Sequence, residues 1–135
     1  MDRIERLLGK VSTLPDSQLK VSYQDGRAQV DLGSGRGQTV FIERDGDCYV
    51  LTSVVLGATR TEQQSDDIVA FAGTLWRRNR QTDVVNFIID GQNRLVGRID
   101  HPAETLDATE LFFYLARLAI ECDRMEYLLT GENRF

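Results

Sequence analysis

Hydrophobic and polar residues change their spacing several times along the chain, and each change marks a new element. The first apolar residues repeat at helical spacing, as Ile4, Leu7, Leu8 and Val11. From Leu19 to Leu56 the period becomes two, which is typical of strands. Asp25-Gly26 and Asp45-Gly46 fit tight turns, because these residue types tolerate positive φ. The pattern predicts a short helix followed by a meander of about four strands.

The middle of the chain predicts a loop, a helix and a hairpin. Gly57 to Gln64 is polar and is interpreted as a loop. Ser65-Asp66-Asp67 supplies capping chemistry for a helix that ends in a run of arginines. Two apolar runs, Val84 to Ile89 and Leu95 to Ile99, flank the turn residues Gly91-Gln92-Asn93. This arrangement indicates a second hairpin.

The clearest element is a helix of about 22 residues near the end of the chain. Asp107 and Glu110 form a capping pattern, and Gly131 stands where a helix C-terminus favours glycine. One apolar stripe is spaced by fours and threes, as Leu111, Leu115, Leu118, Cys122, Met125 and Leu129. A second set recurs every seven residues on another flank, as Phe113, Ile120 and Tyr127. We expect the first stripe in the core and the second to leave apolar surface for contacts beyond the helix's own sheet.

The order of elements predicts the fold class. A helix, a strand meander, a helix, a hairpin and a helix show no strand–helix–strand alternation. We therefore expect an α+β fold, an antiparallel sheet with helices segregated to one side, in the order α-β-β-β(β)-α-β-β-α. A chain of 135 residues predicts one domain, spanning residues 1–135.

Charge and hydropathy exclude some partners. The formal net charge is -5, which disfavours binding to nucleic-acid phosphates. The single basic cluster, Trp76-Arg77-Arg78-Asn79-Arg80, offers a stacking surface for a base, although arginines at a helix end more often complement the helix dipole. The charged N-terminus carries no apolar signal core, and no apolar run approaches the roughly 20 residues of a membrane span. We expect a cytoplasmic protein that binds neither nucleic acid nor membrane.

The residues with reactive side chains do not form a recognisable site. Cys48 and Cys122 lie far apart within apolar runs, and His101 is the only histidine, so no metal-ligand spacing exists. The glycines between residues 33 and 37 precede a predicted strand, whereas a phosphate-binding loop opens a helix. No GxSxG pattern is present. We expect no catalytic residue, metal, cofactor or small-molecule substrate.

Two segments carry a resemblance to a known family. The long helix from Leu106 to Gly131, with the sequence LDATELFFYLARLAIECDRMEYLLTG, resembles the C-terminal helix of YbjN-type proteins. The hairpin from Asn86 to Gly97 fits the same pattern. YbjN-type proteins share a structural superfamily with the class I type III secretion chaperones (CesT-like) of bacteria. The resemblance implies an α+β protomer, commonly a homodimer, without catalytic residues or cofactor.

The resemblance also implies where partners bind. In the secretion chaperones, apolar patches on the first helix and the sheet hold an extended client segment, and the middle helix with the adjoining sheet edge builds the dimer. The corresponding candidates for client binding are Leu7, Leu8, Val11, Val40 and Ile42. The candidates for the dimer contact are Phe71, Leu75 and Trp76. Burial in the core is the alternative for both sets.

We expect a non-catalytic module that holds a protein or peptide client in apolar surface grooves. Two other functions stay open at this point. The chain could be a regulatory protein that docks on a folded partner, as has been proposed for YbjN-type members. It could also be an enzyme of unrecognised type, which a deep pocket with shifted carboxylates near His101 would indicate.

Overall fold

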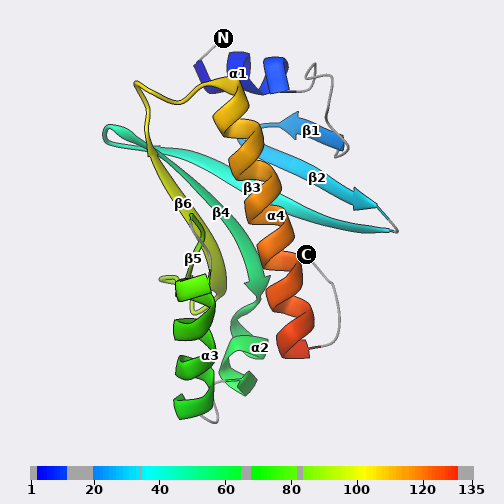
Figure 1. The fold of residues 1–135 in the computed structure, drawn as a ribbon, viewed down its shortest axis with the longest axis vertical. Coiled ribbons are helices and arrows are strands. Elements are labelled where there is room, and N and C mark those ends of the chain that lie inside the picture. The colour runs from blue at the N-terminus through cyan, green and yellow to red at the C-terminus, as the bar shows by residue number, and fades with distance from the viewer. Residues whose placement is uncertain (1–2, 12–19, 34, 65–67, 82–83, 131–135) are drawn as a thin grey trace.

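The computed structural model describes residues 3–11, 20–33, 35–64, 68–81 and 84–130. Within these ranges the elements are α1 (Arg3–Val11), β1 (Lys20–Gln24), β2 (Arg27–Gly33), β3 (Arg36–Asp45), β4 (Cys48–Leu56), α2 (Ala58–Gln64), α3 (Ile68–Gln81), β5 (Asn86–Ile89), β6 (Leu95–Pro102) and α4 (Ala108–Thr130). The predicted α+β class is confirmed, with an antiparallel sheet and helices on one side. Figure 1 shows the long α4 running along the curved sheet.

The described strands form one six-stranded sheet in the order β1-β2-β3-β4-β6-β5. Every neighbouring pair is antiparallel. The turn between β1 and β2 is the predicted one, because Asp25 and Gly26 both adopt positive φ, at 51° and 76°. The hairpin of β5 and β6 joins the meander through the pairing of β6 with β4. β1 and β5 are therefore the two border strands.

Helix α4 supplies the centre of the core. The sixth residue of its predicted stripe, Leu129, is partly buried. The other five have no exposed surface: Leu111, Leu115, Leu118, Cys122 and Met125. α4 approaches β6 so closely at Gly97 that an added Cβ would lie 2.5 Å from the sulfur of Cys122. The predicted core stripe is confirmed, and a glycine in β6 allows the contact.

The second flank of α4 faces outward. Phe113 is 48% exposed and Tyr127 is 43% exposed, while Ile120 is partly buried. Leu128, which the seven-residue pattern does not include, is the most exposed of the large apolar residues on α4, at 60%. The prediction of extra apolar surface on this helix is confirmed.

The start of α4 has the predicted capping box. The backbone N–H of Glu110 donates to the Asp107 carboxylate at 2.7 Å, and the backbone N–H of Asp107 donates to the Glu110 carboxylate at 3.3 Å. The other predicted end markers, Gly131 and Ser65-Asp66-Asp67, lie outside the described residues.

The predicted loop from Gly57 to Gln64 is wrong, because this segment forms helix α2. Its polar composition gives no amphipathic pattern, so the helix depends on contacts from the rest of the fold. The Thr61 hydroxyl accepts the backbone N–H of Leu95 in β6 at 3.1 Å. The side-chain amide of Gln64 donates to the carbonyl of Leu129 near the end of α4, also at 3.1 Å. These hydrogen bonds tie α2 to the strand and the helix on either side of it.

Helix α3 closes one border of the sheet. The side chain of Asn79 accepts the backbone N–H of Phe87 at 2.7 Å and donates to the carbonyl of the same residue at 3.2 Å. One amide side chain thus takes the place of a neighbouring strand at the centre of β5. The border at β1 has no such cover among the described residues, as β1 pairs with β2 alone.

Candidate functional site

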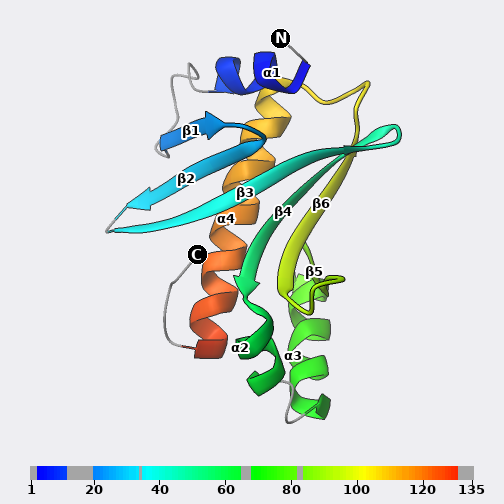
Figure 2. The same cartoon turned by 180° about the vertical axis from the view of Figure 1, so that it is seen from behind.

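The candidate site surrounds α1, which lies across the start of α4 (Figures 1 and 2). The Arg3 guanidinium fixes the start of α1 by donating to the carbonyls of Ala103, Glu104 and Leu106, the last at 2.8 Å. The apolar face of α1 is buried through Ile4, Leu7 and Leu8. α1 is therefore held from both its polar and its apolar sides, and its position defines the hollows beside it.

The first hollow, called here the α1–α4 hollow, lies between α1 and the start of α4. Its volume is about 1050 Å³, and its lining residues are Arg3, Glu5, Arg6, Leu7, Gly9, Lys10, Leu106, Asp107, Ala108 and Thr109. Leu7 is 8% exposed and supplies a small apolar contact above the fully buried Leu106, whereas Arg6 and Asp107 are exposed. This combination of an apolar base and a charged rim is typical of protein-binding surfaces.

The second hollow, the α1–sheet hollow, lies on another side of α1. Its volume is about 460 Å³, and its lining residues are Ile4, Glu5, Tyr23, Asp25, Gly26, Ile42, Arg44 and Tyr49. The Arg44 guanidinium lies over the Tyr49 ring, 5.4 Å from its centre. The Tyr23 hydroxyl accepts the backbone N–H of Gly26 at 3.1 Å. Tyr23 thereby keeps its ring between the turn and α1.

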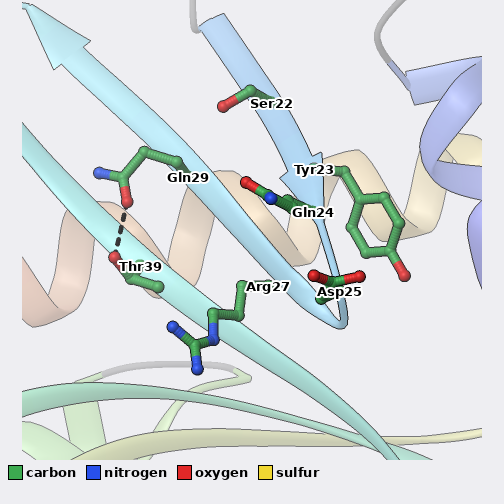
Figure 3. Close-up of a pocket in the computed structure, with 7 residues that line it drawn as sticks. All are labelled: Ser22, Tyr23, Gln24, Asp25, Arg27, Gln29 and Thr39. Atoms are coloured by element: carbon green, nitrogen blue, oxygen red, sulfur yellow. Dashed lines mark hydrogen bonds between the residues drawn. The ribbon is translucent and has the colours of Figure 1, made fainter.

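The third hollow, the strand hollow, continues from the second through their shared residues Tyr23 and Asp25. Figure 3 shows its side chains, which come from β1, β2 and β3 and the turn between the first two strands. Its volume is about 480 Å³, and the lining residues are Ser22, Tyr23, Gln24, Asp25, Arg27, Gln29 and Thr39. The Thr39 hydroxyl donates to the side-chain amide oxygen of Gln29 at 2.6 Å. The surface offers polar donors and acceptors beside the border strand β1.

The geometry of β1 makes this border suitable for a further strand. In a two-residue hairpin the residues that flank the turn form a hydrogen-bonded pair, here Gln24 and Arg27. Because hydrogen-bonded and non-bonded pairs alternate, Val21 and Tyr23 direct their backbone N–H and C=O groups away from β2. An extended segment can pair with these groups and place alternate side chains on the two faces of the sheet.

The five residues predicted to bind a client do not share one surface in the structure. Leu7 lines the α1–α4 hollow and Ile42 lines the α1–sheet hollow, although each is less than a tenth exposed. Leu8 and Val40, at 3% and 0% exposed, line none of these hollows and lie in the core cluster. For these two residues the alternative of core burial describes the structure, because their side chains pack inside the core cluster and are not exposed. The side chain of Val11 lies outside the described part of the chain.

The predicted dimer residues on α3 also divide. Phe71 is 9% exposed and lies in the core cluster, as the alternative of core burial describes, and Leu75 packs partly against the same cluster. Trp76 is 59% exposed, with the Arg80 guanidinium 4.8 Å from its ring centre. Trp76 is therefore the one of these three side chains whose surface is available for a partner.

Two residues with reactive side chains, Cys122 and His101, are held away from the three hollows. Burial raises the pKa of the Cys122 thiol to about 12, although hydrogen bonds with Gly97 and Ser53 oppose the shift. His101 contacts the Tyr114 hydroxyl at 2.6 Å and the Thr105 hydroxyl at 2.9 Å, and it lines none of the three hollows. Among the described residues no group of histidine, cysteine and carboxylate side chains has the geometry to hold a metal ion.

Several residues of the site were missed by the sequence analysis, notably Tyr23, Arg44 and Leu106. They come from β1, β3 and the segment before α4, so they meet only in the folded chain. Alternation in β1 gave the one available signal, since Tyr23 stands on the apolar side of its strand next to a predicted turn.

Three solved structures have a fold similar to that of this chain. A chain of the ExsC–ExsE complex aligns with a TM-score of 0.55 and 20% identity, covering 96% of this chain and 97% of that one. A chain of the HopA1–SchA chaperone–effector complex gives a TM-score of 0.55 and 14% identity, covering 96% and 94%. The Yersinia pestis type III secretion chaperone SycH in complex with a fragment of YscM2 gives a TM-score of 0.51 and 13% identity, covering 93% and 98%.

These similarities show that this chain shares its fold with the three structures, one of which is a type III secretion chaperone. No protein-family model matches the sequence, and no curated protein matches it either. The resemblance to YbjN-type proteins stays a prediction. No helix among the described residues has the length and apolar character needed to cross a membrane.

Proposed function

We propose that this chain is a chaperone-like protein that holds an extended segment of a client protein around α1. The observation that carries the proposal is the pair of hollows beside α1, the second of which shares Tyr23 and Asp25 with the strand hollow at the border strand β1. The fold supports it, since similar folds occur in the HopA1–SchA chaperone–effector complex and in SycH bound to a fragment of YscM2. The protein acts in the cytoplasm, without catalysis and without a cofactor.

Binding is non-covalent and uses two kinds of contact. The client backbone pairs with the outward groups of Val21 and Tyr23, so that it adds a strand to the sheet. Apolar client side chains then enter the α1–α4 hollow beside Leu7, or the α1–sheet hollow beside Ile4 and Ile42. Charged rims beside both hollows keep the free surface hydrated and select the register of the client.

We further propose that the functional unit is a homodimer joined through α3. Support comes from Trp76, a large aromatic side chain that is 59% exposed on the helix outside β5. Aromatic anchors are enriched at the centres of protein interfaces. The client sites around α1 lie at the other end of the molecule from α3, so both surfaces can be occupied at once (Figure 1).

The test uses a variant that removes one outward backbone donor. Val21→Pro deletes the N–H that faces away from β2, whereas Val21→Ala shortens the same side chain and keeps the donor. Wild type and both variants are used for affinity purification from the source cell, with mass spectrometry and circular dichroism of each preparation. We expect wild type and Val21→Ala to recover a client protein in stoichiometric amount. Val21→Pro should lose the client while its circular dichroism spectrum stays that of wild type.

Limited proteolysis of the purified complex then distinguishes the functions. A protected client segment that is extended and has no folded core supports the chaperone-like function. A folded client domain that resists proteolysis without this chain instead supports a regulatory protein docked on a folded partner. Equal recovery of the client with Val21→Pro would refute strand addition at β1.

A further inference from the structure

A second surface lies at the opposite end of the molecule, between α3 and the last turns of α4. This α3–α4 groove has a volume of about 370 Å³ and is lined by Thr74, Arg77, Arg78, Gln81, Leu128 and Leu129. Its α3 residues recur every three or four positions and so share one flank of that helix. Asn79, which contacts β5, and Trp76 lie on other flanks. The groove is thus separate from the α1 hollows and from the proposed dimer contact.

The groove carries an excess of positive charge. Arg78 contacts the Glu121 carboxylate at 3.0 Å, and Arg117 and Arg124 both contact it at 3.3 Å. One carboxylate cannot neutralise three guanidinium groups. Arg77 is exposed and has no ion-pair partner among the described residues. This end of α3 and α4 is therefore basic in a chain whose net charge is -5.

One donor in the groove wall lacks an acceptor. Two nitrogens of the Arg78 guanidinium are used, by Glu121 at 3.0 Å and by the Gln81 side chain at 3.4 Å. The remaining nitrogen, Nε, is buried and has no hydrogen-bond partner within the described part of the chain. An unpaired buried donor is unfavourable, but an occupant of the groove cannot reach this nitrogen. The exposed guanidinium of Arg77 is the donor that the groove offers, and a carboxylate is the acceptor that forms the strongest hydrogen bond with a guanidinium.

The apolar part of the groove lies beside these charges. Leu128 is 60% exposed, the largest exposed fraction among the big apolar side chains of the described residues. Leu129 lines the same groove and is partly buried. An occupant that satisfies both parts must present an apolar side chain next to a carboxylate. Nucleic acid meets the charge but has no aliphatic side chain to cover Leu128.

We propose that the α3–α4 groove binds an acidic, apolar segment of a partner protein. Its carboxylates lie against Arg77 and Arg78, and an aliphatic or aromatic side chain covers Leu128 and Leu129. Charge complementarity identifies this occupant, because the groove attracts acidic chains that the rest of the acidic surface repels. The partner is distinct from the client of the α1 hollows, and the two bind at opposite ends of the fold.

The test titrates the isotope-labelled full chain with a synthetic peptide of repeated Glu-Leu-Leu-Glu and follows backbone amide shifts by NMR. We expect saturable shifts of amides in residues 74–81 and 128–130, and weaker binding as salt rises. Arg77→Glu and Leu128→Ser should each weaken binding about tenfold. Lys20→Glu changes the net charge as much as Arg77→Glu does, but it lies in β1 and should leave the affinity unchanged.

Several results would overturn the proposal. Equal binding of a Lys-Leu-Leu-Lys peptide would show that the surface lacks charge selectivity. A single-stranded oligonucleotide that binds at the same amides, and is insensitive to Leu128→Ser, would make the groove a polyanion site. Peptide affinity unchanged by Arg77→Glu would remove the assigned contact. A loss of self-association with Leu128→Ser in sedimentation would make a second copy of the chain the occupant.

Discussion

The contact between Gly97 and Cys122 gives the sharpest prediction of the fold. A Cβ added at Gly97 would lie 2.5 Å from the Cys122 sulfur, 3.1 Å from a methyl of Leu118 and 3.3 Å from a methyl of Val85. The sulfur cannot move away freely, because Cys122 is fully buried on α4 and donates to the Ser53 carbonyl at 3.7 Å. Gly97→Ala must therefore push α4 away from β6 or distort the strand.

The cost of Gly97→Ala is that of overpacking a core, about 1–3 kcal/mol of unfolding free energy. Cys122→Ala removes the sulfur and loses buried contacts, which costs about 1 kcal/mol. In the double variant the new methyl group occupies the space that the sulfur leaves. We therefore expect the double variant to be more stable than the sum of the single effects predicts, by about 1–2 kcal/mol.

Urea unfolding measures this cycle at one fixed protein concentration, since self-association would shift the midpoint. Gly97→Ala should lower the midpoint without changing the slope. Additive effects of the two substitutions, or a Gly97→Ala midpoint equal to that of wild type, would show that α4 does not approach β6 in this way. Leu115→Ala in the same series is a control for loss of core volume, because Leu115 is fully buried on α4 and is not among the three nearest neighbours of the added Cβ.

Three further predictions concern the surface, the titrating groups and the thiols. Trp76→Ala should weaken self-association, which a lower weight-average mass in sedimentation equilibrium would show; an unchanged mass would refute the α3 contact. Burial favours the neutral form of Asp90, but hydrogen bonds from Arg94 and Gln92 outweigh it and lower the pKa of this carboxyl. The ionised carboxylate therefore stabilises the fold above about pH 4, and this stability is lost as the pH falls through the lowered pKa. Asp90→Asn should flatten the pH dependence of stability between about pH 5 and 3. A thiol reagent at pH 8 should modify the partly buried Cys48 well before the fully buried Cys122, whose pKa is near 12; equal rates would contradict the position of α4.

Periodicity predicted correctly those elements that bury one apolar face along their whole length. The α4 stripe and its capping box follow directly from spacing and local hydrogen bonds, and the structure has both. Helix α2 has no such pattern. It depends on Thr61 and Gln64, whose partners Leu95 and Leu129 lie 34 and 65 residues away along the chain. A local reading of residues 57–64 cannot contain that information.

The candidate site was predictable only in part, for the same reason. Apolar spacing in α1 and β3 identified Leu7 and Ile42, which line hollows, together with Leu8 and Val40, which do not. Spacing reports which residues share a face, but it does not report where that face ends. Leu7 borders the α1–α4 hollow and Leu8 does not, and this difference arises only when α4 and the sheet pack against α1.

The Asn79 side chain that covers β5 also limits how copies of this protein can assemble through their sheets. Filament growth by strand pairing requires two free borders on every subunit, one to add to and one to be added to. Here the side-chain amide of Asn79 occupies the border at Phe87, so among the described strands β1 is the border that is left to pair. A pair of copies joined β1 to β1 would have no free border left, and such an assembly stops at two. One asparagine thus limits strand-to-strand growth while leaving β1 available for the client strand proposed above.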